Sequence, residues 1–378
     1  MTVAQPGVAA GAGGSSLDQR FMNLALTLGR RGLGRTWPNP SVGAVIVREE
    51  GGVPVIVGRG VTQPGGRPHA ETEALKQAGS LAKGATLYVT LEPCSHHGKT
   101  PPCADAIVAA GVGRVVSALE DPNPEVAGQG HARLRAAGIK VDVGIGAQEA
   151  LRAHAGHIRR IRDGRPHVTL KLGVSADGKA GLPGRKPVAI TGQAAWDRVH
   201  MMRAQNDAIL IGIGTALSDD PKLTCRLPGM AVYSPVRVIL DSRLRLPLTS
   251  ALAKSARETP VWIFGSGGAE QDLRATGIDV LHASGEGGQF DLSDILKQLA
   301  AHGITRLMVE GGPTVAASFL NADLIDEVAL FRAPKTIGGE GIDALEGLPL
   351  TALTGSPRLA SRGIETVGED TLEWFERR

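Results

Sequence analysis

Two short stretches of the chain hold residues that could bind a metal ion. The first is His69-Ala70-Glu71, and the second runs from Pro93 to Cys103 with cysteines at 94 and 103. One imidazole and two thiolates supply three ligands for a tetrahedral zinc ion and leave its fourth position open to water, which is typical of catalytic rather than structural sites. Glu71 is placed to transfer protons and not to bind the metal. The two stretches therefore predict a hydrolytic zinc site.

The order of these residues along the chain indicates which class of zinc-dependent reaction to expect. His-x-Glu followed by Pro-Cys and a second cysteine is the signature of zinc deaminases, in which zinc-activated water attacks a ring carbon that carries an amino group. A structural zinc site is the alternative, with His96 or His97 as a fourth ligand, and free cysteines are also common as small buried side chains. The glutamate and the open position favour catalysis.

The composition of the 378-residue chain is that of a soluble globular protein, with 42% hydrophobic and 21% charged residues, and the length predicts two domains. No apolar run reaches the roughly 18 residues of a membrane-spanning helix. Residues 1–17 lack the basic and apolar regions of a signal peptide and predict a disordered tail. Only Cys225 lies outside the metal motif, so we expect no disulfide framework and a cytoplasmic location.

The net charge and the aromatic content indicate which kinds of binding partner to expect. A net charge of +3 is too small to indicate nucleic-acid binding, and aromatic residues, at 3%, offer few stacking platforms for bases. A small anionic substrate fits this balance better. We therefore expect neither nucleic acid nor membrane among the partners.

The elements expected around the metal motif form one α/β layer domain. Apolar residues at helical spacing follow Asp18, a candidate N-cap. A helix over 69–78 holds His69 and Glu71 in its first turn, and a second helix over 104–110 opens at Cys103. Zinc would then lie between two helix N-termini, where the dipoles favour anionic ligands. The other expected elements are strands over 44–47, 53–57, 85–91, 114–119 and 139–143 and a helix over 130–137.

A second α/β pattern follows a helical, basic segment. We place the zinc domain at 18–149, a linker at 150–166 and the second domain at 167–378. Strands that alternate with helices predict a mostly parallel sheet. The expected strands cover 167–174, 207–213, 236–241, 261–264, 304–310, 327–332 and 370–375, and the expected helices cover 192–203, 291–301 and 313–320.

Three features of the second domain are candidate ligand contacts. Gly212-Ile213-Gly214 follows a strand, but Leu217 breaks the dinucleotide fingerprint. The turn over 310–314 closes a strand and opens a helix, a geometry that binds phosphate, although a plain βα turn explains it equally well. The segment from Arg203 to Arg226, which includes Asp207 and Asp219, gathers charged residues that suit phosphate and sugar hydroxyls, with a solvated loop as the alternative.

Both halves of the chain resemble one family, the bifunctional riboflavin-biosynthesis deaminase/reductases, from about Asp18 to the C-terminus. The motif PCSHHGKTPPC (93–103) is specific to this family, because other nucleobase deaminases space the two cysteines as C-x-x-C. The remaining matching motifs are PNPSVGAVIV (38–47), HAE (69–71), DPNPEVAGQG (121–130), KLGVSADGK (171–179), RAQNDAILIGIGTALSDDPKLTCR (203–226), VRVILDSR (236–243), VEGGPTVAASFL (309–320) and APKTIGG (333–339).

The resemblance implies a cytidine-deaminase-like fold followed by a dihydrofolate-reductase-like α/β fold. It also implies two consecutive reactions on a small phosphorylated pyrimidine. The first is hydrolytic deamination of 2,5-diamino-6-ribosylamino-4(3H)-pyrimidinone 5′-phosphate, and the second is NADPH-dependent reduction of the ribosyl group to ribityl. One zinc ion per chain, NADPH, and a homodimer or homotetramer are implied with them.

The resemblance also assigns roles to residues at matching positions. In the first domain, His69, Cys94 and Cys103 would bind zinc, Glu71 would transfer protons, and Asn39, His96 and Lys99 would contact the substrate. In the second domain, the substrate would be contacted by Lys171, Arg203, Leu223, Arg226 and Glu310. The cofactor would be contacted by Val174, Thr215, Asp219, Ser242, Gly312, Pro313, Thr314, Val315, Ala316, Ala317 and Ser318.

One departure from the family pattern lies in the second domain. Where the family often has Ser-x-Trp before Ile-Thr, this chain has Pro187-Val188-Ala189 before Ile190-Thr191. Because two cofactor contacts are missing there, a chain in which only the deaminase works is an alternative. An alternative of another class is a nucleic-acid-binding protein with a structural zinc ion, which the low basicity disfavours.

Overall fold

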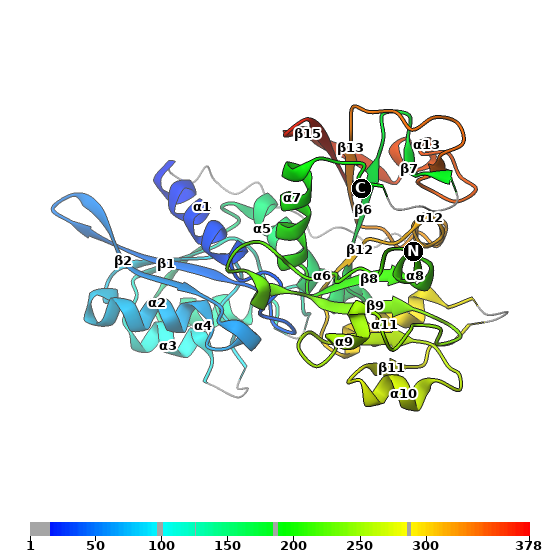
Figure 1. Cartoon of the computed structure of the whole chain (residues 1–378). Helices are drawn as coiled ribbons and strands as arrows, with labels where there is room; N and C mark the ends of the chain where they lie inside the picture. The colour runs from blue at the N-terminus through cyan, green and yellow to red at the C-terminus, as the bar shows by residue number, and fades with distance from the viewer. Residues whose placement is uncertain (1–15, 97–100, 125, 184–187, 286–288) are drawn as a thin grey trace. The chain divides into compact units, whose positions relative to one another are not determined.

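The computed structural model describes residues 16–96, 101–124, 126–183, 188–285 and 289–378 (Figure 1). The chain divides into two compact units, Met1–Asp163 and Gly164–Arg378. The predicted positions Lys99 and Pro187, the alternative ligand His97, and residues 1–15 of the predicted tail lie outside the described residues. No helix in the described part of the chain is long and apolar enough to cross a membrane.

Unit 1 is built on one mixed sheet with the strand order β2-β1-β3-β4-β5. β1 pairs antiparallel with β2, its hairpin partner, and also with β3, while β3, β4 and β5 run parallel. The predicted strands are confirmed with ends shifted by a few residues. The strands are β1 (Gly43–Glu50), β2 (Val53–Val61), β3 (Thr86–Val89), β4 (Arg114–Ser117) and β5 (Lys140–Val143). The helices are α1 (Ser16–Arg30), α2 (Ala70–Ala78), α3 (Cys103–Ala109), α4 (Gln129–Ala136), α5 (Ala147–Ala153) and α6 (Ala155–Asp163).

Alternation of side chains along the strands divides the core of unit 1 into two layers. Ile46 and Leu87 point to the face covered by α2, α3 and α4, where they pack with Ala74 and Ile107. Val45, Val47 and Tyr88 point to the opposite face, where they pack with α1 and with Ala150 of α5. Figure 1 shows α1 on one side of this sheet and α2 and α3 on the other. His69 and Cys103, at the starts of α2 and α3, therefore lie on the helix-covered face of this sheet.

The prediction that Asp18 caps the first helix is wrong. α1 begins at Ser16, and the Asp18 side chain is turned into the core, where it accepts a hydrogen bond from Tyr88 Oη at 2.7 Å. The Arg114 guanidinium donates to both Asp18 oxygens, at 2.8 and 3.0 Å. Because these partners come from β3 and β4, Asp18 fixes α1 on the sheet instead of starting the helix.

The predicted linker range, 150–166, contains most of α5 and all of α6. His154 Nε2 lies 3.1 Å from Thr90 Oγ1 just beyond β3, and His157 Nε2 lies 3.7 Å from an Asp121 oxygen. Thr90 Oγ1 in turn accepts from the Gly43 N–H. These two helices therefore pack onto the same unit as the zinc motif.

Unit 2 is built on a sheet of nine strands among the described residues, in the order β11-β10-β9-β8-β12-β6-β13-β16-β15. The strands from β11 to β13 are parallel to one another, which confirms the predicted parallel sheet, and β16 and β15 extend it antiparallel. The predicted strands are β6 (His167–Val174), β8 (Ala208–Gly212), β9 (Val236–Leu240), β10 (Val261–Phe264), β12 (Arg306–Val309), β13 (Glu327–Arg332) and β16 (Asp370–Arg377). The predicted helices are α7 (Gln193–Ala204), α11 (Leu292–Ala301) and α12 (Pro313–Asn321).

The elements of unit 2 that sequence patterns missed are mostly short. A strand of two or three residues carries no readable alternation, and β15 exposes most of its residues as the edge strand of the sheet. They are β7 (Lys179–Gly181), β11 (Asp279–Leu281), β14 (Ile342–Asp343), β15 (Leu359–Val367), α8 (Ile213–Asp219), α9 (Ala251–Lys254), α10 (Glu270–Ala275) and α13 (Thr351–Thr354).

Candidate active sites

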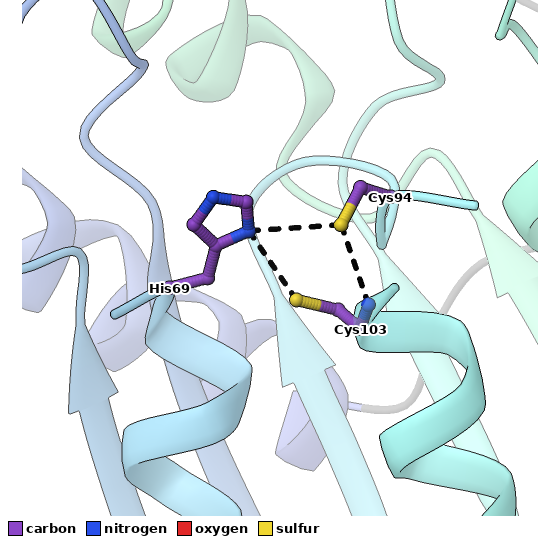
Figure 2. A group of neighbouring side chains, drawn as sticks. All are labelled: His69, Cys94 and Cys103. Carbon is purple, nitrogen blue, oxygen red and sulfur yellow. Dashed lines mark hydrogen bonds between the residues drawn. The ribbon is translucent and has the colours of Figure 1, made fainter. Parts of the chain in front are cut away.

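The three predicted zinc ligands converge at the N-terminal ends of α2 and α3 (Figure 2). His69 Nδ1 lies 3.6 Å from Cys94 Sγ and 3.3 Å from Cys103 Sγ. Two ligand atoms on a tetrahedral zinc ion with ordinary bond lengths lie about 3.6 Å apart. The spacing of the group therefore fits a single zinc ion.

The surroundings of Cys94 favour a thiolate. The Cys103 backbone N–H donates to Cys94 Sγ at 3.3 Å. Hydrogen bonds from Cys103 and His69 lower the pKa of Cys94 to about 4, and hydrogen bonding to that thiolate together with burial raises the pKa of Cys103. A bound divalent cation would favour deprotonation of the second sulfur as well.

Glu71 lies in the first turn of α2 and is buried, with 3% of its surface exposed. It is not part of the His-Cys-Cys group, but it interacts electrostatically with all three of those side chains. Burial, together with the negative Cys94, raises the pKa of Glu71 to about 7, and His69 opposes part of this increase. A carboxyl that titrates near neutral pH can both accept and donate a proton there.

Of the remaining predicted residues of this site, Asn39 and His96 lie on loops. Asn39 Nδ2 donates to the Gly66 carbonyl at 3.1 Å, which holds it beside the segment that leads into His69. His96 is exposed and interacts electrostatically with Asp121. Lys99 lies outside the described residues.

In unit 2, all five predicted substrate residues line one cavity of about 610 Å³. It opens beside the carboxyl ends of β6, β8 and β12, where ligands of parallel sheets commonly bind. The five are Lys171, Leu223, Arg226, Arg203 and Glu310. Arg226 and Lys222 are exposed cations at this cavity, so they are the basic side chains best placed to meet a phosphate group.

The Arg203 side chain is bound on several sides by neighbouring residues of the cavity wall. Its Nε and Nη2 both donate to the Glu310 carboxylate at 2.8 Å, and its Nη1 donates to the Thr224 carbonyl. Both side chains are less than a tenth exposed. Arg203 and Glu310 therefore form a buried, bidentate pair in the cavity wall. Lys171 lies near this pair, and burial lowers its pKa while Glu310 opposes that effect.

A second cavity, of about 740 Å³, adjoins the first and shares Gly214, Thr215 and Gly312 with it. Its wall combines the loop after β9 with the first turns of α8 and α12. A Cβ atom on Gly312 would lie 3.0 Å from Thr215 Oγ1, so the two helix starts approach closely there. The predicted cofactor residues that line one or both cavities are Thr215, Asp219, Ser242, Gly312, Pro313, Thr314, Val315 and Ser318.

Three predicted cofactor residues do not line either cavity. Val174, Ala316 and Ala317 are buried in the core, because alternate positions of a strand and one face of a helix must point away from a ligand. Asp207, part of the charged segment, also lies elsewhere. Its buried carboxylate accepts from the backbone N–H groups of Thr305 and Arg306.

Some lining residues escaped sequence reasoning. Val188, Thr191 and Trp196 border the first cavity, although the family's Ser-x-Trp is absent from this stretch. Arg245 and Gln289 border the second cavity. A basic residue shortly after a strand that flanks a candidate dinucleotide site is a signal that could have pointed to Arg245.

Two family models match the chain. Residues 15–119 match the cytidine and deoxycytidylate deaminase zinc-binding region, and residues 166–372 match the RibD C-terminal domain. The first region contains His69, Cys94 and Cys103, and the second contains both cavities of unit 2.

Relatives match the chain over nearly its full length. It is 42% identical to the riboflavin biosynthesis protein RibD of Aquifex aeolicus, covering 96% of this chain and 99% of that protein, and 40% identical to that of Escherichia coli, covering 93% and 97%. The structure of Acinetobacter baumannii RibD is similar, with a TM-score of 0.84, 36% identity, and coverage of 96% of this chain and 99% of that one. The Thermotoga maritima deaminase/reductase gives a TM-score of 0.82 at 34% identity, with the same coverage.

Proposed function

Because the chain belongs to the RibD family of bifunctional riboflavin-biosynthesis deaminase/reductases, we propose a role for each of its two sites. It is a bifunctional enzyme, and its substrate is a phosphorylated pyrimidine. The predicted fold class and function are confirmed at this level. Since the matches cover both domains, neither the deaminase-only alternative nor the nucleic-acid-binding alternative is retained.

Unit 1 would hold one zinc ion through His69, Cys94 and Cys103. The donor set of one nitrogen and two sulfurs, with an open fourth position, is that of a catalytic site, and the distances between the donor atoms fit. Zinc supplies a Lewis acid that activates water at neutral pH. Glu71 would take a proton from this water and deliver one to the leaving amine, so that the 2-amino group departs as ammonia. Its burial beside the ligands supports that role.

The loops around this site would select the substrate. Asn39 is held beside the entry to His69 and would contact the pyrimidine, while His96 and Lys99 would reach the sugar phosphate. The proposed substrate is 2,5-diamino-6-ribosylamino-4(3H)-pyrimidinone 5′-phosphate.

Unit 2 would bind NADPH across the second cavity and the deaminated pyrimidine in the first. The glycine turn at the start of α12 leaves backbone N–H groups open to phosphate, and Thr215, Ser242 and Ser318 add hydroxyl groups. When bound there, NADPH would supply the hydride that reduces C1′ of the ring-opened sugar. Arg226 would hold the phosphate, and the Arg203–Glu310 pair and Lys171 would fix the substrate beside the nicotinamide.

The observation that carries this proposal is the convergence of His69, Cys94 and Cys103 beside the buried Glu71. Metal analysis of the purified chain should give one zinc ion per chain. Cys103→Ser should lose zinc and ammonia release but keep NADPH oxidation on the deaminated substrate. Retention of full zinc content in that variant would contradict the assignment.

We also propose, from the family resemblance, a homodimer or homotetramer in the cytoplasm, in keeping with the free cysteines. Light scattering on the eluting protein would measure the assembly, and a monomer at micromolar concentration would contradict the proposal.

A further inference from the structure

A second group of potential metal ligands lies close to the zinc motif. It consists of Glu92, Glu120 and His131, whose ligand atoms lie within 4.8 Å of one another. Glu92 is two residues before Cys94, and its side chain is 2% exposed. A carboxylate buried this deeply needs partners, which could be a metal ion or hydrogen-bond donors.

Backbone donors already satisfy Glu92. Its Oε2 accepts from the N–H groups of Asp121 and Gly128 at 3.0 and 2.9 Å. Its Oε1 accepts from Gly130 and His131 at 2.8 and 3.2 Å. Four N–H groups use the approximately four lone-pair sites of a carboxylate. The group is therefore not built to hold a second metal ion.

Three of these four N–H donors belong to the start of α4, so Glu92 connects its own segment to that helix. Gly128 is the N-cap of α4, and Gly130 and His131 lie in its first turn, where a helix needs acceptors for its free N–H groups. The N-cap of α4 is a glycine in the left-handed conformation, which makes no side-chain cap bond. Glu92 thus caps α4 from a distant part of the chain, and its negative charge suits that end of the helix dipole.

A close steric contact also holds the start of α4 against the segment from Glu92 to Cys94, and we call this contact region the junction. A Cβ atom on Gly130 would lie 2.0 Å from the Pro93 carbonyl oxygen, so α4 packs directly on the backbone between Glu92 and Cys94. Beyond Cys94, Arg133 of α4 donates to the Ser95 carbonyl at 3.2 Å and pairs with Asp105 of α3 at 2.5 Å. The segment that carries Cys94 is therefore held by α4 on both sides of the cysteine.

We propose that Glu92 is a positioning residue for the zinc site, which holds Cys94 in the geometry that the metal requires by tying its segment to the first turn of α4. The inference rests on the proposed zinc site and concerns how that site is kept in place. Residues behind a metal's ligands commonly determine its affinity, and changing them costs about 10- to 100-fold in metal affinity or activity.

Glu92→Gln tests the proposal, with Glu120→Gln as the matched control. The glutamine amide offers one acceptor oxygen, and its NH2 group would face two N–H donors. We expect Glu92→Gln to bind zinc about 10- to 100-fold more weakly in a chelator competition assay and to alter the absorption spectrum of the cobalt-substituted protein. Glu120 is an exposed carboxylate of the same group, so Glu120→Gln should match the wild type in both measurements.

Gly130→Ala is a second test of the same junction. The added methyl group would press on the Pro93 carbonyl, so this variant should weaken zinc binding in the same way. A purely structural role for Glu92 would lower the melting temperature of unit 1 while leaving zinc affinity and the cobalt spectrum unchanged. NADPH oxidation by unit 2 serves as the internal check on each preparation.

The possible results distinguish a failure of this inference from a failure of the proposed function. A folded Glu92→Gln variant with wild-type zinc affinity and cobalt spectrum would overturn the inference. If Glu92→Gln fails to fold, the same two measurements on Gly130→Ala decide, and wild-type values would overturn it. A wild-type protein that binds no zinc at all would instead contradict the proposed function, so the two failures are distinguishable.

Discussion

Replacing Glu310 by glutamine should destabilise unit 2 strongly. Glu310 follows β12 and accepts two hydrogen bonds at 2.8 Å from Arg203, which comes from the last turn of α7. The two side chains are 9% and 6% exposed. The variant leaves the Arg203 cation buried without its counter-charge, which is far more costly than losing a pair on the surface.

The size of the effect can be estimated from the ionisation of Glu310. Burial alone would raise its pKa, but the positive Arg203 and its hydrogen bonds outweigh burial and lower the pKa from 4.5 to about 2. That difference corresponds to about 3 kcal/mol at neutral pH, which agrees with the roughly 3–5 kcal/mol for breaking a buried pair. Because the folded-state pKa is lowered, this stabilisation is complete above the unfolded value of 4.5 and is lost as the pH falls towards 2. At pH 3 less than half of this stabilisation, about 1 kcal/mol, should remain.

Urea unfolding of the full chain, followed by tryptophan fluorescence, measures this difference, since Trp196, Trp262 and Trp374 all lie in unit 2. At pH 7 the midpoint for Glu310→Gln should fall by about 1–2 M relative to the wild type, and the gap between their unfolding free energies should narrow at pH 3. Glu270→Gln, which breaks an exposed i,i+4 pair with Arg274, is the control and should change stability by about 0.5 kcal/mol or less. Equal midpoints for Glu310→Gln and wild type, or a gap that is constant from pH 7 to pH 3, would refute the reasoning.

Three further substitutions test the proton transfer by Glu71, the phosphate contact of Arg226 and the packing of α1 through Asp18. Glu71→Gln should slow ammonia release by about 10²–10⁴-fold because its proton transfer is lost, with zinc content unchanged by metal analysis; loss of zinc would identify Glu71 as a ligand. Arg226→Ala should lower kcat/KM for NADPH-dependent reduction about 10- to 100-fold by removing its proposed phosphate contact while sparing deamination, and equal loss of both activities would indicate misfolding. Asp18→Asn should lower the unfolding free energy of unit 1 by about 2 kcal/mol, since Arg114 loses its buried partner. Denaturant unfolding followed by ammonia release checks this value, and an unchanged midpoint would contradict it.

The zinc site could be predicted from sequence because its essential residues lie in two short motifs at helix starts. His69 and Glu71 share one turn, and Cys103 opens the next helix along the chain. The hydrophobic periodicity of the longer helices and strands predicted that these helices pack on a sheet. The zinc site could therefore be predicted from short stretches of sequence. The five residues of unit 2 that were predicted to contact substrate do line one cavity. They come from different elements, since Glu310 follows β12, Lys171 lies on β6 and Arg203 ends α7, so their convergence depends on the fold.

Side-chain partners distant in the sequence could not be predicted in this way. Asp18 is a good N-cap type, but its pairing with Arg114 depends on how α1 packs on the sheet. Arg203 carries a charge suited to phosphate, and only the fold shows that Glu310 accepts from its Nε and Nη2 while the Thr224 carbonyl accepts from its Nη1. Nothing in the sequence next to Glu92 indicates its role. The N–H groups that donate hydrogen bonds to it belong to the start of a helix almost forty residues later.

The most direct test of the central claim is a stoichiometric assay on the intact protein. Purified chain is given the diamino pyrimidine substrate and NADPH, and ammonia and oxidised cofactor are measured together, with and without prior removal of metal. Both products should form in equal amounts, and metal removal should abolish ammonia release but leave NADPH oxidation on the deaminated substrate intact. Oxidation of NADPH without any ammonia release from the diamino substrate would contradict it.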